Sequence, residues 1–191
     1  MNALLRPALT LLVTLTLLAG GIYPLVVTGL AQAIFPAQAN GSLMREGDQV
    51  IGSSLIGQPF AAPETFWGRL SATVPHPYNA AASLGSNLAP TSADLLAAAQ
   101  ERITALHAAD PTNDAPIPVD LVTASASGLD PHISVAAALY QLPRVAQARG
   151  VDAAQIRSLI DAATEERQFG ILGEPRVNVL KLNLMLEGGD W

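Results

Sequence analysis

The sequence predicts a single N-terminal transmembrane helix followed by one exported α/β (α+β) domain with a small sheet and about three main helices. No charged side chain occurs between Arg6 and Arg45, and residues 8–35 are mostly Leu, Val, Ala, Thr and Ile. A helix needs roughly 20 apolar residues to cross a bilayer, so this stretch can span one with some tilt. Helix-like and strand-like patterns then alternate along the rest of the chain.

The predicted anchor, residues 8–35, is interrupted by glycines and by Pro24. Such residues are tolerated inside a membrane when neighbouring helices or Ser and Thr side chains satisfy the freed backbone groups. We expect Gly20, Gly21 and Gly29 to let a second helix approach closely, as small residues do between membrane helices. The alternative is that these glycines serve only the packing of this chain itself.

The charges around the anchor predict its orientation. Arg6 and the amino terminus precede it, whereas Arg45, which follows it, is offset by Glu46 and Asp48. By the positive-inside tendency, residues 1–7 are cytoplasmic and residues 36–191 form a periplasmic domain, in a single-pass protein of the cell inner membrane. Cleavage after Ala37-Gln38-Ala39, a signal-peptide pattern, is the alternative, and it also exports the domain.

The composition narrows the possible partners. The exported part has about 155 residues, close to the usual size of one domain. Setting aside Arg6 from the ten basic residues leaves nine against sixteen acidic ones, and no basic cluster is evident. We therefore expect no nucleic-acid partner. Cysteine is absent, which excludes disulfides, thiolate metal ligands and a cysteine nucleophile.

Residues 59–91 are predicted to form an irregular segment that faces a partner. Prolines interrupt it at positions 59, 63, 75, 77 and 90. Its aromatic side chains argue against disorder. We expect Phe66, Trp67 and Tyr78 to anchor a partner interface, because aromatic residues dominate binding hot spots. Packing in the domain core is the alternative for them.

Three helices are predicted in the domain. The first covers residues 92–109 and ends at Asp110-Pro111. The second covers 130–149, with Asp130 as its cap, Pro131 in its first turn, Pro143 as a kink and Gly150 after its end. The third covers 152–166, where the spacing of Asp152 and Gln155 resembles a capping box.

Strands are predicted over three short stretches. Residues 49–57 are β-prone and are followed by a proline, and residues 119–123 follow two prolines. Residues 177–186 alternate apolar Val and Leu with polar Asn and Lys, which favours a half-buried closing strand.

Enzyme motifs give little support for catalysis by this chain. Neither a phosphate-binding GxxxxGK[ST] loop nor a GxSxG elbow occurs, and the three histidines lie far apart without a metal-binding pattern. We expect no catalytic residue and no metal site. The alternative is a tethered or secreted hydrolase that joins Ser125 or Ser127 to His132 and Asp130. A free periplasmic binding protein is a third class.

Many ordered segments along the chain resemble the C subunit of the bacterial Kdp potassium-transporting ATPase. Any one of them alone would be weak, but together they cover nearly the whole sequence. They are LRPAL (5–9), GGIYPLVVT (20–28), QANGSL (38–43), GSSLIGQPF (52–60), GRLSAT (68–73), YNAAASLGSNLAPT (78–91), PVDLVTASASGLDPHIS (118–134), QLPRVAQARG (141–150) and VNVLKLNL (177–184).

The resemblance implies a non-catalytic accessory subunit of an ATP-driven, high-affinity potassium uptake complex. The partners it implies are a channel-like potassium-binding subunit, a P-type ATPase catalytic subunit and a very small membrane peptide. It also implies that the subunit stabilises the assembly and acts as a catalytic chaperone that raises the ATP affinity of the catalytic subunit. No cofactor is expected to bind this chain directly, and ATP is implied only by the resemblance.

The sequence departs from the family pattern at two positions in the irregular segment. Leu84 replaces one glycine of a glycine-rich stretch, giving SLGSN, and Leu70 stands in GRLSAT where the family often has proline. An exported domain cannot touch cytoplasmic ATP, so an effect on ATP affinity has to be transmitted through the anchor. A tenfold effect needs only about 1.4 kcal/mol.

Overall fold

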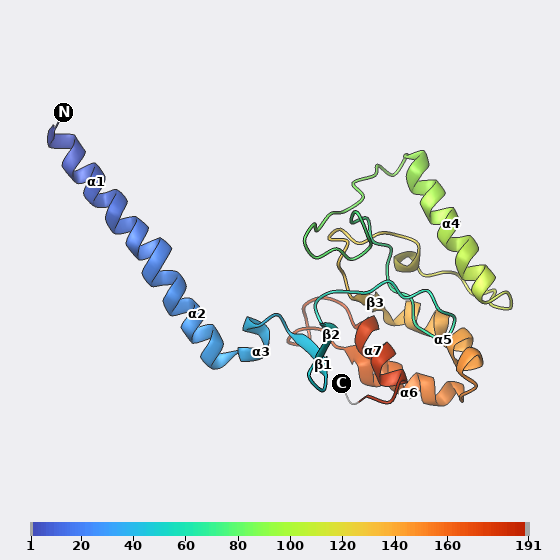
Figure 1. The fold of residues 1–191 in the computed structure, drawn as a ribbon. Helices are drawn as coiled ribbons and strands as arrows, with labels where there is room; N and C mark the ends of the chain where they lie inside the picture. The colour runs from blue at the N-terminus through green and yellow to red at the C-terminus, as the bar shows by residue number, and fades with distance from the viewer. Residues whose placement is uncertain (1, 190–191) are drawn as a thin grey trace. The chain divides into compact units, whose positions relative to one another are not determined.

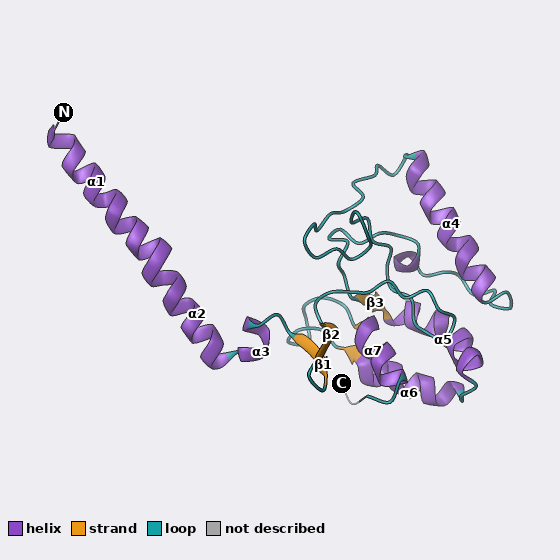
Figure 2. Cartoon of the chain, in the orientation of Figure 1, coloured by secondary structure: helices purple, strands orange, loops and turns teal. Residues whose placement is uncertain are grey.

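The computed structural model describes residues 2–189, which divide into two compact units (Figure 1). The first unit extends to Ser53 and the second begins at Ser54. Figure 2 shows that helix dominates the first unit, that the second unit combines helices with long irregular segments, and that strands are short. The predicted class, one apolar N-terminal helix followed by a domain with small sheets and several helices, is confirmed.

The first unit is built on a long apolar helix. It consists of α1 (Asn2–Leu17), the π-helical turn η1 (Leu18–Ile22) and α2 (Tyr23–Ile34). Residues Leu4–Ile34 form the one candidate membrane span within residues 2–189, and none of this span is buried in the chain itself. Its 31 residues correspond to a length of about 46 Å, which exceeds the roughly 30 Å of bilayer hydrocarbon.

The π-helical turn explains how the helix continues past Pro24. A proline inside an α-helix lacks the N–H for the usual bond, and its ring clashes with the carbonyl four residues earlier, here that of Gly20. The N–H of Tyr23 instead donates to the carbonyl of Leu18, five residues back. The wider turn gives the Gly20 carbonyl room, so the proline changes the helix locally and does not end it.

A short helix and a hairpin complete the first unit. Helix α3 (Pro36–Ala39) precedes strands β1 (Leu43–Glu46) and β2 (Gln49–Ser53), which pair antiparallel with Glu46 opposite Gln49. The strand predicted over 49–57 therefore ends four residues earlier, at Ser53. Strand β1 was not predicted, because it has only four residues, LMRE, and these do not alternate between apolar and polar.

The second unit contains a three-stranded antiparallel sheet of order β3-β5-β4. Its strands are β3 (His132–Ser134), β4 (Thr164–Glu165) and β5 (Arg176–Asn178). The helices are α4 (Ala93–Ala109), α5 (Val135–Arg149), α6 (Ala153–Ala163) and α7 (Val179–Leu186). Helix α6 packs against both α5 and α7, whereas α4 lies at the edge of the unit (Figure 1). The core joins residues of the sheet, of these helices and of the irregular segment.

Two predicted helices begin where their caps indicate. Helix α4 follows Ser92, and helix α6 follows Asp152, whose carboxylate accepts from the N–H of Ala154. Gly150 ends α5 in the left-handed conformation, as predicted. Helix α6 stops at Ala163, three residues before the predicted end, because residues 164 and 165 pair with β5. Residues 59–91 are irregular, as predicted.

The predicted cap at Asp130 is wrong. The Asp130 carboxylate accepts from the N–H of His132, an Asx turn that leads into an extended strand, not into a helix. Helix α5 begins five residues later at Val135, and Ser134 caps it by accepting from the N–H of Ala137.

The strand predicted over 119–123 is also wrong, because residues Val119–Leu121 form a short 3-10 helix, η2. The side chain of Asp120 holds this turn by accepting from the backbone N–H and the hydroxyl of Ser134, at 2.7 and 3.2 Å. Thr123 adds a bond from its hydroxyl to the carbonyl of Val119. These side-chain bonds compete with strand geometry.

The closing strand predicted over 177–186 is wrong beyond Asn178. The Asn178 side chain accepts from the N–H of Lys181 and starts α7. The segment fits a helix as well as a strand, because Val179, Leu182 and Asn183 lie three and four residues apart and all are buried on one face. An N-cap and good helix formers decide between the two periods.

Candidate functional site

Two of the three predicted interface aromatics lie in the core. Phe66 is fully buried and Trp67 is 7% exposed, so the structure places both in the core packing that was the alternative. Their backbone groups are held by two buried side-chain amides. Asn183 accepts from the N–H of Phe66 at 2.8 Å and donates to its carbonyl at 3.0 Å. Gln141 makes the same two bonds to Trp67, at 2.8 and 3.1 Å.

The indole of Trp67 contacts two guanidinium groups. The central carbons of Arg102 and Arg144 are 4.9 and 4.7 Å from the ring centroid, a cation–π distance in both cases. Arg144 also donates to the carbonyls of Pro63 and Thr65, so one helix side chain holds much of the irregular segment. Burial lowers the pKa of Arg144 to about 10, which leaves it charged at neutral pH.

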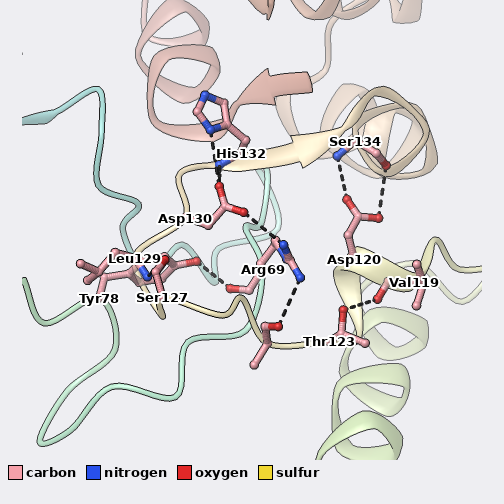
Figure 3. Close-up of polar contacts among 11 residues, drawn as sticks. Arg69, Tyr78, Val119, Asp120, Thr123, Ser127, Leu129, Asp130, His132 and Ser134 are labelled. Carbon is pink, nitrogen blue, oxygen red and sulfur yellow. Dashed lines mark hydrogen bonds and ion pairs between the residues drawn. The ribbon is translucent and has the colours of Figure 1, made fainter. Parts of the chain in front are cut away.

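Tyr78, the third predicted anchor, is half-buried and closes over two glycines. Its hydroxyl donates to the carbonyl of Arg69 at 2.6 Å (Figure 3). A Cβ atom on Gly57 would lie 2.4 Å from the ring, and one on Gly68 would lie 2.7 Å from the hydroxyl. A side chain at either position would therefore force Tyr78 to shift. Burial raises the pKa of Tyr78 to about 12, with smaller opposing effects from the nearby arginines.

Next to Tyr78, two arginine–carboxylate pairs and the imidazole of His132 between them form a chain of polar contacts. Arg69 contacts Asp130 at 3.1 Å, and the other oxygen of Asp130 lies 3.4 Å from Nδ1 of His132 (Figure 3). On its far side His132 lies 3.5 Å from Glu165, which pairs with Arg176 at 2.8 Å. This chain of contacts joins the irregular segment to β3, β4 and β5.

Within this chain of contacts, the carboxylate of Asp130 is held in its ionised form. Burial would raise the pKa of Asp130, but hydrogen bonds from the side chain and backbone of His132 and from Arg69 outweigh burial and lower it. A pocket of about 570 Å³ opens beside the chain, with Arg69, Asp130, His132 and Arg176 in its lining. Asp130 and Glu165 are each paired with an arginine, so this side of the pocket is lined by a structural ion-pair network.

The hydrolase triad is not assembled. Within residues 2–189 no hydrogen bond joins His132 to Ser125 or Ser127, and the Ser127 hydroxyl instead accepts from the N–H of Leu129 (Figure 3). The same residues include no group of three or more His, Asp or Glu side chains that could hold a metal ion.

The three anchor glycines lie on the exposed helix of the first unit. Gly20 and Gly21 belong to the π-helical turn and Gly29 to α2. A Cβ atom on any of them would meet no atom of residues 2–189 within 4 Å. The packing of the chain itself therefore gives no reason for glycine at these positions.

Sequence reasoning missed the side chains that hold the irregular segment. Gln141 and Arg144 lie in α5, and Asn183 lies where a strand was expected, so each resembles an ordinary surface residue in the sequence. The one available signal was polar side chains inside strongly apolar stretches, such as Asn183 between Leu182 and Leu184.

Comparison with known proteins gives a uniform result. Residues 5–188 match the family described as "KdpC: K+-transporting ATPase, c chain". A protein of Methylococcus capsulatus named potassium-transporting ATPase KdpC subunit is 60% identical over 182 residues, which cover 95% of this chain and 96% of the relative. Proteins with the same name from Methylibium petroleiphilum and Herpetosiphon aurantiacus are 62% and 59% identical, over 98% of this chain and 98% and 97% of their own lengths. The chain therefore belongs to the KdpC family, the c chain of potassium-transporting ATPases.

Proposed function

We propose that this chain is a single-pass accessory subunit that stabilises an ATP-driven potassium uptake complex, with its second unit outside the cytoplasm. Family membership supplies the accessory role in a potassium-transporting ATPase. The observation that carries the rest is the apolar helix Leu4–Ile34, which no part of the chain buries. Such a helix needs a bilayer or other membrane helices around it.

Gly20, Gly21 and Gly29 are the proposed contact points of the anchor with a neighbouring membrane helix. Glycines that face no atom of their own chain are useful where another backbone approaches, and close approach is what small residues provide between membrane helices. The proposed neighbours are the channel-like potassium-binding subunit, the P-type catalytic subunit and the small membrane peptide.

The proposed effect on the catalytic subunit is a raised ATP affinity. In the proposed orientation the second unit lies across the membrane from ATP, so the effect is a coupling free energy carried by the anchor and its neighbours. A tenfold change in affinity corresponds to about 1.4 kcal/mol, which is within reach of a few helix contacts.

Co-purification tests the assembly role. The tagged chain is expressed with its pump subunits, extracted in mild detergent, and assayed for its bound partners and for potassium-stimulated ATPase activity. We expect a channel-like and a P-type subunit in fixed ratio, and a higher KM for ATP when the chain is left out. An isolated chain, or an unchanged KM, would contradict the respective part of the proposal.

Cysteine labelling tests the orientation. The chain has no cysteine, so a single Gln100→Cys change on the exposed face of α4 gives a unique thiol. We expect a membrane-impermeant maleimide to label it in intact spheroplasts. Labelling only after the membrane is permeabilised would place the second unit in the cytoplasm.

A further inference from the structure

The loop between β4 and β5 presents three large apolar side chains to solvent. Phe169 is 89% exposed, Ile171 74% and Leu172 55%. We call these three residues the hairpin tip. Single exposed apolar residues are common on protein surfaces, but three within four positions at the end of one hairpin form a patch that a soluble surface seldom carries without a use.

The backbone of the hairpin tip is ordered by its own hydrogen bonds. Gln168 and Leu172 exchange two backbone bonds of 2.9 Å, which close a tight turn. Inside this three-residue loop the N–H of Ile171 also donates to the carbonyl of Gln168, at 3.2 Å, and Phe169 and Gly170 occupy the two central positions of that inner turn with φ of +54° and +74°. Asn-Gly is the usual pair in such a turn, and a bulky aromatic at the first position is strained. The turn therefore holds a phenyl ring outward at a position where local preference would select asparagine.

The stem below the hairpin tip is tied to the core. Thr164 pairs with Val177 and Glu165 with Arg176, and Val177 is fully buried. Arg167 and Glu174 form an ion pair across the loop. A tip on such a stem loses little conformational freedom when a partner covers it, so its apolar surface is available for binding.

Acidic groups lie beside the hairpin. A groove next to it is lined by Asp161, Glu166 and Glu174, together with Val135, Thr164 and Pro175. Asp161 pairs with Arg157 and Glu174 with Arg167, so Glu166 is the carboxylate of this lining that has no arginine partner within residues 2–189, and the groove keeps a net negative charge. Segments that bind an anionic bilayer surface instead carry an excess of Lys and Arg beside their apolar residues. The charge pattern favours a protein surface with an apolar recess and basic side chains at its edge.

We propose that the hairpin tip inserts into an apolar recess with a basic rim on a neighbouring subunit of the pump. This inference rests on the proposed function, because it names the surface through which the second unit meets its complex. The tip supplies the apolar contact, and the acidic groove beside it fixes the orientation on the partner.

The decisive variant combines Phe169→Asn, Ile171→Ser and Leu172→Ser. Asparagine at position 169 suits the positive φ, so the turn is retained while the apolar surface is removed. The control combines Leu96→Ser and Val119→Ser, two side chains of the same unit that are 64% and 71% exposed. Each full-length chain is co-expressed with the pump subunits, purified through its tag, and compared for retained partners and for far-ultraviolet circular dichroism.

We expect the tip variant to retain at least tenfold less of the partner subunits, with an unchanged dichroism spectrum, while the control retains wild-type amounts. If the wild-type chain retains its partners and the tip variant does so equally, this inference is overturned and the proposed function stands. Equal loss in the tip variant and the control also overturns it. A wild-type chain that retains no partner contradicts both this inference and the proposed function.

A fluorescent label separates a protein recess from the bilayer. Gln168→Cys places a unique thiol next to the hairpin tip for an environment-sensitive dye, and Gln100→Cys is its control. We expect a blue shift at position 168 only in the assembled complex. The same shift in the chain alone, held in nanodiscs of phosphatidylethanolamine and phosphatidylglycerol, would assign the tip to the membrane and overturn the proposal.

Discussion

Replacing Asn183 by alanine tests whether side-chain amides hold the irregular segment. Asn183 is buried, and its side chain pairs with both the N–H and the carbonyl of Phe66. In the alanine variant both backbone groups stay buried and lose their partners. Position 183 lies within α7, so the substitution leaves the helix itself intact or slightly favoured.

The expected loss follows from the two unpaired groups. A buried donor or acceptor left without a partner costs about 1–3 kcal/mol, so two of them cost about 2–6 kcal/mol. The better helix propensity of alanine offsets about 0.5 kcal/mol of this loss in the free energy of unfolding. We therefore expect the free energy of unfolding to fall by about 3 kcal/mol. With an m value of about 2 kcal/mol/M, the urea midpoint moves down by about 1.5 M.

Urea unfolding of the full-length chain in mild detergent measures this loss, with the fluorescence of Trp67 as a probe beside the affected bonds. Gln100→Ala is the matched control, since it also removes an amide from a helix but at an exposed position. We expect the control to change the free energy of unfolding by less than about 0.5 kcal/mol. If the two variants shift the midpoint equally, the amide of Asn183 does not hold the segment.

Three further changes probe the surroundings of Tyr78 and Asp130. Gly57→Ala places a methyl group 2.4 Å from the ring of Tyr78 and should lower the free energy of unfolding by about 1–3 kcal/mol. The control Gly29→Ala, whose methyl group meets no described atom within 4 Å, should not lower it. Equal effects of the two changes in urea unfolding would contradict the close contact. The pKa of Asp130 is lowered in the folded state, so its contribution to stability is present above about pH 4, the pKa of an unfolded aspartate, and is lost as the pH falls further. Asp130→Asn should therefore flatten the decline of unfolding free energy between about pH 5 and pH 3, and an unchanged slope would count against these bonds. The pKa of Tyr78 is raised to about 12, so its contribution is complete below about pH 10 and is lost as the pH rises toward 12. In absorbance titrations at alkaline pH, Tyr78→Phe should remove the tyrosine with a pKa near 12, and a loss near pH 10 would refute the assignment.

Elements with local signals could be predicted from the sequence. The long apolar N-terminal helix was predicted from its uncharged apolar length, and helices α4 and α6 from Ser92 and Asp152 before periodic apolar residues. Each of these signals acts within one or two helical turns. The family followed from many short segments in the right order.

Elements set by distant hydrogen bonds could not be predicted in this way. Asp120 folds its own segment into a turn because it binds Ser134, fourteen residues away. Asp130 looked like a helix cap, but its carboxylate is engaged by His132 and by Arg69 from the irregular segment. Asn178 and Asn183 suited a polar strand face equally well, and only the tertiary structure shows that one caps a helix and the other holds a loop.

The proposed partner-binding surface was the hardest feature to predict from the sequence. Aromatic content singled out Phe66 and Trp67, and both serve the core. The hairpin tip went unnoticed because Phe169, Ile171 and Leu172 form a short apolar run that resembles a buried strand. Exposure distinguishes the two cases, and exposure depends on which face of the folded unit the turn reaches.

The amide pairs of Gln141 and Asn183 also bear on the motion of the irregular segment. Loops without regular structure normally exchange their amide hydrogens with solvent quickly, because they open without disturbing the rest of a protein. The N–H groups of Phe66 and Trp67 cannot open unless α5 or α7 releases them. Although these N–H groups lie in coil, we expect them to exchange as slowly as the helices that hold them.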